Sequence, residues 1–420
     1  MKKLTFAVMG MGNRGTAYAA KALKYPEEME ITAMADTRRI RLDAANKYLH
    51  IPEDRLFDSA EAIFSVPKMA EIMIISTQDA QHKEHALKAM ELGYDLLLEK
   101  PISNKLEDIA VIAEAAKRLG RRVIVCHVLR YTVFYQQAKK LIDSGVIGRV
   151  RSVEASEQVA YYHYAHSYVR GNWHSTAASS PMILAKCSHD MDILRWLVGK
   201  KCKTISSIGQ LSYFKKENAP EGATPRCKDC KVENCIYNAQ KFYVSRIPGW
   251  PANVLQPEPT EENILKTLDE TNYGHCVFLT ENDVVDHQTV QMEMEDGITI
   301  TFQMVAFSNN MTRTLRVYGT EGEIWGDFHE RALYYQRFGG KVEKIDLEAL
   351  CSDFTGHGGG DSQMVYDVIR LYRGDDFDNT FITYLEPSVE SHYMAFCAEQ
   401  SRLEGGKVLN LDEYIAGLNK

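Results

Sequence analysis

Apolar runs and helical patterns alternate over about the first 125 residues of the chain. The apolar runs predict strands at Leu4–Met9, Ile31–Ala35, Ile72–Ser76, Leu96–Leu98 and Val123–Cys126. The residues between them predict helices at Gly12–Leu23 and His82–Leu92. Alternation of strand and helix is typical of a parallel sheet with helices on both faces. We therefore predict an α/β fold whose N-terminal domain, residues 1–128, is a doubly wound parallel sheet.

The pattern changes after about residue 129, where apolar and polar positions alternate. It predicts strands at Val150–Gln158, Thr204–Leu211, Val284–Glu293, Ile298–Ala306 and Thr314–Tyr318. Consecutive strands joined by tight turns favour antiparallel pairing. We therefore predict a C-terminal α+β domain, residues 129–420, with a large open and mostly antiparallel sheet that holds the substrate. Residues 213–275, which are rich in proline, are predicted to be an irregular excursion from this domain.

The composition narrows the expected partners. The chain has 420 residues and a formal net charge of −8, whereas nucleic acids and anionic membranes are bound by basic surfaces. No apolar run is long enough to span a bilayer, and the first residues do not resemble a secretory signal. The nine cysteines, an odd number, fit reduced thiols. We expect a cytoplasmic protein that binds a small molecule and neither nucleic acid nor membrane.

A glycine-rich turn follows the first predicted strand and opens the first helix. Gly10, Gly12 and Gly15 have the G-x-G-x-x-G spacing. The first glycine permits a tight turn, the second lets a pyrophosphate approach the backbone, and the third allows close packing of helix and strand. Asp36 ends the second predicted strand, where a carboxylate can accept hydrogen bonds from the adenosine ribose. The sequence thus predicts a Rossmann domain that binds NAD, although two arginines shortly after Asp36 leave NADP open.

Two further motifs lie at the ends of later strands of this domain. They are Leu98-Glu99-Lys100-Pro101 and Ser76-Thr77-Gln78-Asp79-Ala80-Gln81-His82. With the glycine fingerprint, they make the chain similar over nearly its whole length to the Gfo/Idh/MocA family of glucose–fructose oxidoreductase and inositol dehydrogenase relatives. The resemblance implies action on sugars, inositols or their derivatives with tightly held NAD(P), in homo-oligomers packed through the second domain's sheet. It also implies that Lys100 lies beside the nicotinamide and the substrate hydroxyl, where an ammonium can stabilise developing negative charge.

The residues that we expect to contact the cofactor come from the fingerprint and from the strand ends that follow it. They are Gly10, Gly12, Asn13, Arg14, Gly15, Asp36, Thr37, Ser76, Thr77, Gln78, His82, Glu99 and Lys100. These segments follow the strands at whose carboxyl ends α/β proteins bind their ligands.

A helix is predicted to begin at Ser180-Pro181, because serine followed by proline is a favourable helix start. Lys186 and His189 are three residues apart and project together from it. The resembled family has D-x-x-x-H on its catalytic helix, and His189 aligns with that histidine, a residue type suited to acid–base work near neutral pH. We expect catalysis from Lys100, His189 and Lys186. Because Ala185 replaces the family's aspartate, the reaction cannot simply be inherited.

Three segments are candidates for contacts with a carbohydrate. Residues 161–174 are dense in aromatic and hydrogen-bonding side chains, which suit sugars, although a packed aromatic edge or a subunit contact would look the same. Residues 356–361 place glycines around a histidine and a carboxylate, or else form a helix entry. The third segment, Arg130-Tyr131, follows the last predicted strand of the Rossmann domain and resembles the family's substrate-side arginine position. The candidate substrate-binding residues are Arg130, Tyr131, His166, Tyr168, Arg170, Trp173, His357 and Asp361.

Three cysteines lie close together in the irregular excursion. Cys227 and Cys230 have C-x-x-C spacing, and Cys235 follows. Two thiolates in one turn can share a metal ion. A fourth ligand, Cys276 or His275, would complete a structural zinc site, and free thiols are the alternative.

The leading interpretation is an NAD-dependent oxidoreductase that transfers a hydride from a ring hydroxyl of a sugar, glycoside or related polyol to the nicotinamide. His189 would be the acid–base group, and Lys100 would orient the oxygen. Two alternatives stay open. One is an NAD-dependent glycoside hydrolase that oxidises a hydroxyl transiently, eliminates the aglycone and reduces the product back. The other is a non-catalytic sensor that binds NAD without turnover.

Overall fold

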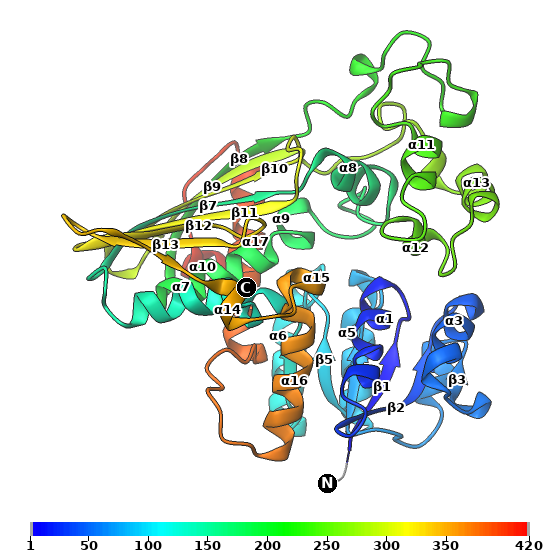
Figure 1. Cartoon of the computed structure of the whole chain (residues 1–420), viewed down its shortest axis with the longest axis horizontal. Helices are drawn as coiled ribbons and strands as arrows, with labels where there is room; N and C mark the ends of the chain where they lie inside the picture. The colour runs from blue at the N-terminus through cyan, green and yellow to red at the C-terminus, as the bar shows by residue number, and fades with distance from the viewer. Residues whose placement is uncertain (1–2, 418–420) are drawn as a thin grey trace.

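The structure, a computed structural model, describes residues 3–417 and contains two sheets in two domains (Figure 1). The N-terminal sheet is parallel throughout, with strand order β3-β2-β1-β4-β5-β6. Its strands are β1 (Leu4–Met9), β2 (Met29–Ala35), β3 (Leu56–Phe57), β4 (Ile72–Ile75), β5 (Asp95–Leu98) and β6 (Val123–Val125). The strand order reverses between β1 and β4, and ligands of such sheets bind beside this point, at the carboxyl ends of the strands.

Helices cover both faces of the parallel sheet (Figure 1). They are α1 (Asn13–Ala19), α2 (Lys21–Lys24), α3 (Arg39–Leu49), α4 (Ala60–Phe64), α5 (His82–Glu91) and α6 (Leu106–Leu119). Two helices from the far end of the chain join them, namely α16 (Gly360–Arg373) and α17 (Leu385–Leu403). Met364 and Val368 of α16 share a buried core with Phe6 of β1, so α16 is fixed to the Rossmann domain.

The second sheet has nine strands in the order β14-β13-β12-β11-β7-β10-β9-β8-β15. They are β7 (Val150–Gln158), β8 (Cys202–Gln210), β9 (His287–Met294), β10 (Thr299–Val305), β11 (Thr312–Gly319), β12 (Gly322–Asp327), β13 (Ala332–Arg337), β14 (Val342–Ile345) and β15 (Leu409–Asn410). Every neighbouring pair is antiparallel except β7 with β10, which is parallel. The expectation of a mostly antiparallel C-terminal sheet is therefore confirmed.

Short helices connect and cover this second sheet. They are α7 (Val133–Asp143), α8 (Tyr161–Tyr164), a π-helix (Ala165–Arg170), α9 (Met182–Ala185), α10 (Ser188–Val198), α14 (Leu347–Leu350), α15 (Thr355–Gly358) and α18 (Leu411–Gly417). The single helix expected after Ser180-Pro181 is interrupted between α9 and α10. None of the helices within residues 3–417 combines the length and apolar character that crossing a bilayer requires.

The irregular segment 213–275 contains α11 (Ala239–Val244), α12 (Ala252–Leu255) and α13 (Glu261–Glu270). Its helices enclose a small core of their own, which includes Tyr243 and Ile264. Figure 1 shows α12 facing the Rossmann domain, and Arg38 at the start of α3 donates a hydrogen bond to the main-chain oxygen of Leu255 at 3.3 Å. The excursion therefore reaches back over the Rossmann domain. The division of the chain at residue 128 stays a prediction.

Candidate active site

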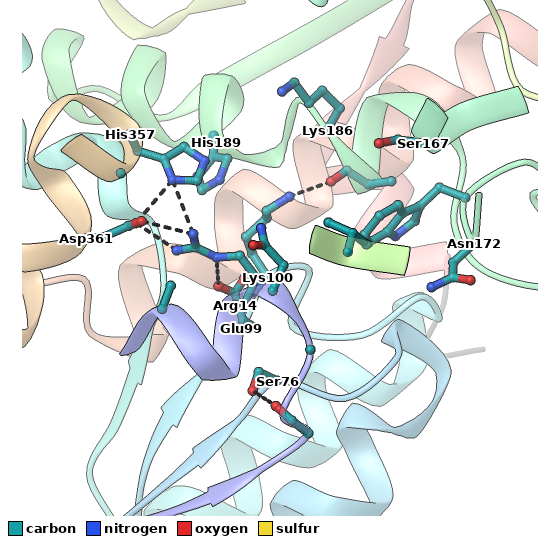
Figure 2. Close-up of a pocket in the computed structure, with 18 of the residues that line it drawn as sticks. Arg14, Ser76, Glu99, Lys100, Ser167, Asn172, Lys186, His189, His357 and Asp361 are labelled. Carbon is teal, nitrogen blue, oxygen red and sulfur yellow. Dashed lines mark hydrogen bonds and ion pairs between the residues drawn. The ribbon is translucent and has the colours of Figure 1, made fainter. Parts of the chain in front are cut away.

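A cavity of about 1090 Å³ lies between the carboxyl ends of the Rossmann strands and the second domain. Figure 2 shows part of its lining, with side chains that come from both domains. The expected site residues that line it are Gly10, Gly12, Asn13, Arg14, Asp36, Thr37, Ser76, Thr77, Gln78, His82, Glu99, Lys100, His166, Tyr168, Trp173, Lys186, His189, His357 and Asp361. The fold thus brings residues expected for cofactor, catalysis and substrate into one space.

The glycine-rich turn is sterically suited to a dinucleotide. Gly10 has φ +89°, and a Cβ there would lie 2.6 Å from the main-chain oxygen of Ser76. A Cβ at Gly15 would lie 1.9 Å from the oxygen of Gly10, so Gly15 serves close packing and does not line the cavity. A Cβ at Gly12 would have only one neighbour within 4 Å, a guanidinium nitrogen of Arg41 at 3.8 Å. The open space over Gly12 fits the approach of a pyrophosphate to the backbone.

Asp36 binds the turn as well as lining the cavity. Its Oδ2 accepts a hydrogen bond from the main-chain N–H of Met11 at 2.7 Å, and its Oδ1 accepts one from Arg38 N–H at 2.8 Å. The guanidinium of Arg41 lies 3.4 Å from Oδ2. A carboxylate with a neighbouring cation therefore lies at the end of β2, where a ribose is expected.

Lys100 joins the two domains at the centre of the cavity. Its Nζ donates a hydrogen bond to the main-chain oxygen of Ala185 at 2.6 Å. Figure 2 marks this bond of Lys100 with a dashed line. Burial lowers the pKa of Lys100, against the neighbouring Glu99 carboxylate, which raises it. The amine is therefore held at the substrate side by a main-chain partner on α9 and can give up a proton more readily than a surface lysine.

Arg14 of the fingerprint is the centre of a buried ionic network. It donates to Glu99 at 2.9 Å and to both carboxylate oxygens of Asp361 at 2.7 and 3.0 Å. Tyr18 donates from its hydroxyl to Glu99 at 2.6 Å. Burial raises the pKa of Glu99, but Arg14 and Lys100 outweigh it and keep the carboxyl ionised. The network ties the glycine-rich turn to α16.

His189 and Lys186 both line the cavity, although they flank the break between α9 and α10. Burial, together with the charge of Lys100, lowers the pKa of His189 well below its usual value. His189 Nδ1 is buried and has no hydrogen-bond partner among residues 3–417. The imidazole is therefore neutral at pH 7 and able to accept a proton. The Lys186 ammonium lies 3.5 Å from Oε1 of Glu157.

Two buried carboxylates share Arg313 behind these groups. Glu157 on β7 and Arg313 on β11 are directly paired across the strands and form an ion pair. Arg313 also donates from Nε to Asp190 at 2.8 Å. Burial raises the pKa of Asp190 to about 6, against the effect of Arg313, which lowers it. The cluster fixes β7, β11 and α10 to one another beneath the cavity.

The aromatic segment contributes part of the cavity wall. Trp173 donates from its indole N–H to Asp79 at 3.2 Å, and Asp79 also accepts from Ser180 at 2.7 Å. The ring of His166 is stacked on Tyr273 of the excursion with centroids 5.2 Å apart, and burial lowers the pKa of His166 to about 3. The segment therefore packs between the Rossmann domain and the excursion, and also exposes polar atoms to the cavity.

Three of the expected substrate residues do not line the cavity. Arg130 forms two hydrogen bonds with Asp192 in a buried pair. Tyr131 bonds to Thr383 in the Rossmann core. Arg170 donates to main-chain oxygens of the excursion. Each side chain is occupied by a buried partner, and nothing in this geometry supports substrate contact for it.

All nine cysteines are free thiols. Four of them, Cys227, Cys230, Cys235 and Cys276, line one small pocket beside Arg170. Within residues 3–417, however, no three or more His, Cys, Asp or Glu side chains are arranged so that they could hold a metal ion. The expected structural zinc site is therefore not supported. Burial raises the pKa of Cys235 and of Cys276, which favours their protonated form.

Several lining residues were not anticipated from the sequence. Glu157 and Arg313 meet across paired strands that are far apart in the chain, and no local motif marks them. Trp250 and Tyr273 come from the irregular excursion. Asp79 lies inside the Ser76–His82 motif that follows β4, so the sequence did contain a signal that could have identified it.

Two family models match the chain. The model described as "Oxidoreductase family, NAD-binding Rossmann fold" matches residues 4–127, and that described as "Oxidoreductase family, C-terminal alpha/beta domain" matches residues 139–349. The chain belongs to the Gfo/Idh/MocA oxidoreductase family. The resemblance drawn from the E-K-P and glycine motifs is thus confirmed, as is the α/β class of this Gfo/Idh/MocA protein.

Relatives match this Gfo/Idh/MocA protein over different shares of its length. The YteT protein of Bacillus subtilis is 25% identical over 399 residues, which is 90% of each chain. An inositol 2-dehydrogenase of Streptomyces avermitilis is 29% identical over 222 residues, covering 52% of this chain and 59% of that protein. An oxidoreductase structure from Agrobacterium radiobacter, in complex with NAD+, L-tartaric acid and magnesium, superimposes with a TM-score of 0.70 at 15% identity, covering 98% of this chain and all of that one. At this identity the likeness shows a shared fold.

Proposed function

We propose that this Gfo/Idh/MocA protein transfers a hydride between NAD and a ring hydroxyl of a sugar, glycoside or related polyol. The proposal depends on one observation: Lys100 from the Rossmann domain and His189 from the second domain line the same cavity, which continues to the glycine-rich turn. Lys100 orients the hydroxyl oxygen, and the neutral imidazole of His189 accepts its proton. NAD, when bound, supplies the hydride acceptor.

The residues at the end of β2 lead us to expect NAD and not NADP as the cofactor. Asp36 is expected to accept hydrogen bonds from the ribose hydroxyls and to repel a 2′-phosphate, which favours NAD. Arg41 beside it works in the opposite direction, yet it lies 3.4 Å from the same carboxylate. Because its charge is partly balanced there, we infer a preference for NAD.

A polyol fits the character of the substrate side. Trp173 and Tyr168 offer aromatic faces, while Lys186 and His357 offer hydrogen-bonding groups in the same cavity. The named activity of the inositol dehydrogenase relative points to the same class of compound.

We also infer that the protein forms a homo-oligomer. Light scattering of the purified protein tests this.

One experiment separates this proposal from its alternatives. The purified protein is incubated with NAD+ and either a polyol panel that includes myo-inositol or a panel of p-nitrophenyl glycosides. Absorbance at 340 nm reports NADH, and a second wavelength reports p-nitrophenol. Net NADH formation supports the dehydrogenase, whereas p-nitrophenol release without net NADH supports the glycoside hydrolase. Bound NAD with neither signal supports the sensor and overturns the proposal.

A further inference from the structure

A second histidine reaches the cavity beside His189. His357 lies in the turn α15, and the centroids of the two imidazole rings are 5.9 Å apart. The His357 side chain is 34% exposed and lines the cavity, whereas Asp361 beneath it is only 2% exposed. In Figure 2 the two imidazoles lie next to each other above Arg14 and Asp361. Two proton-accepting groups from different elements therefore face one region.

The bond between His357 and Asp361 orients the imidazole. His357 Nδ1 lies 3.1 Å from Oδ1 of Asp361. Burial raises the pKa of Asp361, but Arg14 and His357 outweigh it and keep the pKa well below its usual value. An ionised carboxylate only accepts hydrogen bonds, so Nδ1 carries the hydrogen and Nε2 keeps its lone pair.

Arg14 is a second neighbour of Nδ1 and, as a donor, would favour a lone pair there. Its contact at 3.4 Å is longer than that of Asp361 at 3.1 Å, and the guanidinium already donates to both carboxylate oxygens, so the bond to Asp361 decides the tautomer. No hydrogen bond from residues 3–417 reaches Nε2 of His357, while that side chain remains open to the cavity. The basic nitrogen is thus directed away from Asp361 and is free for a ligand.

The backbone holds His357 in a conformation that few side chains adopt. Its φ is +49°, and Gly356, Gly358 and Gly359 around it also have positive φ. A Cβ at Gly359 would lie 2.1 Å from the main-chain oxygen of Asp353, so the turn depends on glycine. A non-glycine residue in this region is disfavoured and persists only where its surroundings fix it, which occurs often at functional sites.

We propose that His357 is a second acid–base residue, oriented by Asp361, which moves a proton at the carbon next to the oxidised one. The proposal rests on the proposed hydride transfer. In that reaction the C–H bond of the alcohol carbon breaks, its electron pair leaves with the hydride to NAD+, and the O–H proton goes to His189. His189 is then protonated and cannot accept a second proton, so a further proton transfer needs another base.

The new carbonyl makes the neighbouring C–H bond acidic. His357 Nε2 takes that proton, the C–H electron pair becomes the C=C bond of an enolate, and Lys100 stabilises the enolate oxygen. Return of the proton restores the ketone, so no further reactant is consumed. The charged and titratable groups near His357 include Asp361, Arg14, Lys186, His189 and His163. Burial lowers the pKa of His357 in spite of Asp361, which leaves the imidazole neutral at pH 7, with a lone pair that can accept a proton.

The first test needs no substrate. The NAD-loaded protein is labelled with 15N-histidine, and two-dimensional NMR identifies the tautomer of each imidazole at pH 7.5. His357→Gln assigns the resonance by its disappearance. We expect the Nδ1–H tautomer for His357 and its loss in Asp361→Asn. An Nε2–H tautomer or an imidazolium in the wild-type protein overturns the proposal, whether or not the Asp361 variant folds.

The second test separates proton transfer at carbon from hydride transfer. With NAD+ and myo-inositol in D2O, deuterium entering the carbons next to the oxidised one is followed by mass spectrometry, and NADH is followed by stopped flow. We expect His357→Gln to lower deuterium uptake at least about 100-fold while changing the first NADH signal only severalfold. Equal losses of both signals, or unchanged uptake, overturn the proposal.

A matched control comes from another histidine–aspartate pair. His287 Nδ1 lies 2.8 Å from Asp286, but His287 does not line the cavity. His287→Gln is expected to leave both signals unchanged. If myo-inositol and the whole polyol panel give no NADH, the proposed hydride transfer fails, and the NMR measurement alone then decides the orientation of His357.

Discussion

The ammonium of Lys100 donates a hydrogen bond to the main-chain oxygen of Ala185 at 2.6 Å. The acceptor of this bond is a main-chain oxygen, which carries no net charge, because the residue at this position is alanine and offers no carboxylate. The carboxylate that raises the pKa of Lys100 most is Glu99, which Arg14 already binds at 2.9 Å. The positive charge of Lys100 is thus left to act on a substrate oxygen.

Replacing Lys100 with methionine keeps most of the length of the side chain and removes this charge. We expect kcat to fall by about 10²–10⁴-fold, since positioned proton-transfer and charge-stabilising groups contribute that much. The dissociation constant of NAD should change little, because the glycine-rich turn is untouched. Steady-state kinetics and calorimetric titration measure the two quantities. Lys105→Met, an exposed lysine in the same segment, serves as the control, and near-normal turnover of Lys100→Met would falsify the assignment.

Asp36 is expected to set the cofactor preference. Asp36→Ala removes a charged acceptor from the ribose site, so NAD should bind roughly 10-fold to 100-fold more weakly. NADP should bind equally well or better, because Arg41 loses its partner at 3.4 Å. Fluorescence titration with both reduced cofactors measures this. Asp36→Asn retains an acceptor for Met11 N–H and separates loss of charge from collapse of the turn; equal weakening for both cofactors in both variants contradicts the role.

The strands could be predicted because burial leaves a direct pattern in the sequence. Val150–Gln158 is observed with the expected bounds, and so is Leu4–Met9, which is almost wholly buried in the parallel sheet. The fingerprint glycines could be assigned because steric demands at Gly10 and Gly15 exclude other residues. Both signals are local, so one sequence suffices to identify them.

The rest of the site depends on contacts between distant segments. Arg130 looked suited to a substrate, yet Asp192, on a helix of the second domain, binds it in a buried pair. Glu157 and Arg313 meet only because β7 pairs with β11. The return of α16 places Asp361 against Arg14. No periodicity or motif spacing encodes such pairings, since they are decided by how the whole chain packs.

Arg313 is expected to be a major contributor to stability. It is 7% exposed and lies between the buried carboxylates of Glu157 and Asp190. Arg313→Met leaves both carboxylates without their shared cation, so the free energy of unfolding should fall by about 3–5 kcal/mol. Urea unfolding measures this. Arg316→Met is the matched control, because its ion pair with Glu323 is partly exposed, at 44% and 22% of the two side chains, and should contribute less than about 1 kcal/mol. Similar losses in the two variants would show that burial of the cluster does not matter.

His127 makes stability depend on pH. Its ring lies between those of His189 and His392, at centroid distances of 5.8 and 5.4 Å, and neither of its nitrogens has a hydrogen-bond partner among residues 3–417. Burial lowers its pKa to about 4, against the effect of Asp192, which raises it. In the unfolded chain a histidine titrates near 6.5. Between these two values the unfolded state therefore binds the additional proton.

The stability contributed by neutral His127 is complete above about pH 6.5 and is lost as the pH falls toward 4, with a slope of up to about 1.4 kcal/mol per pH unit. Buried His392, whose pKa burial lowers to about 3, acts in the same direction. We therefore expect urea unfolding at pH 7, 6 and 5 to show a falling free energy of unfolding, and His127→Gln to show a shallower fall. His50→Gln, an exposed histidine, should keep the wild-type slope. If His127→Gln also keeps the wild-type slope, His127 is protonated in the folded protein, and the neutral state inferred from its burial is wrong.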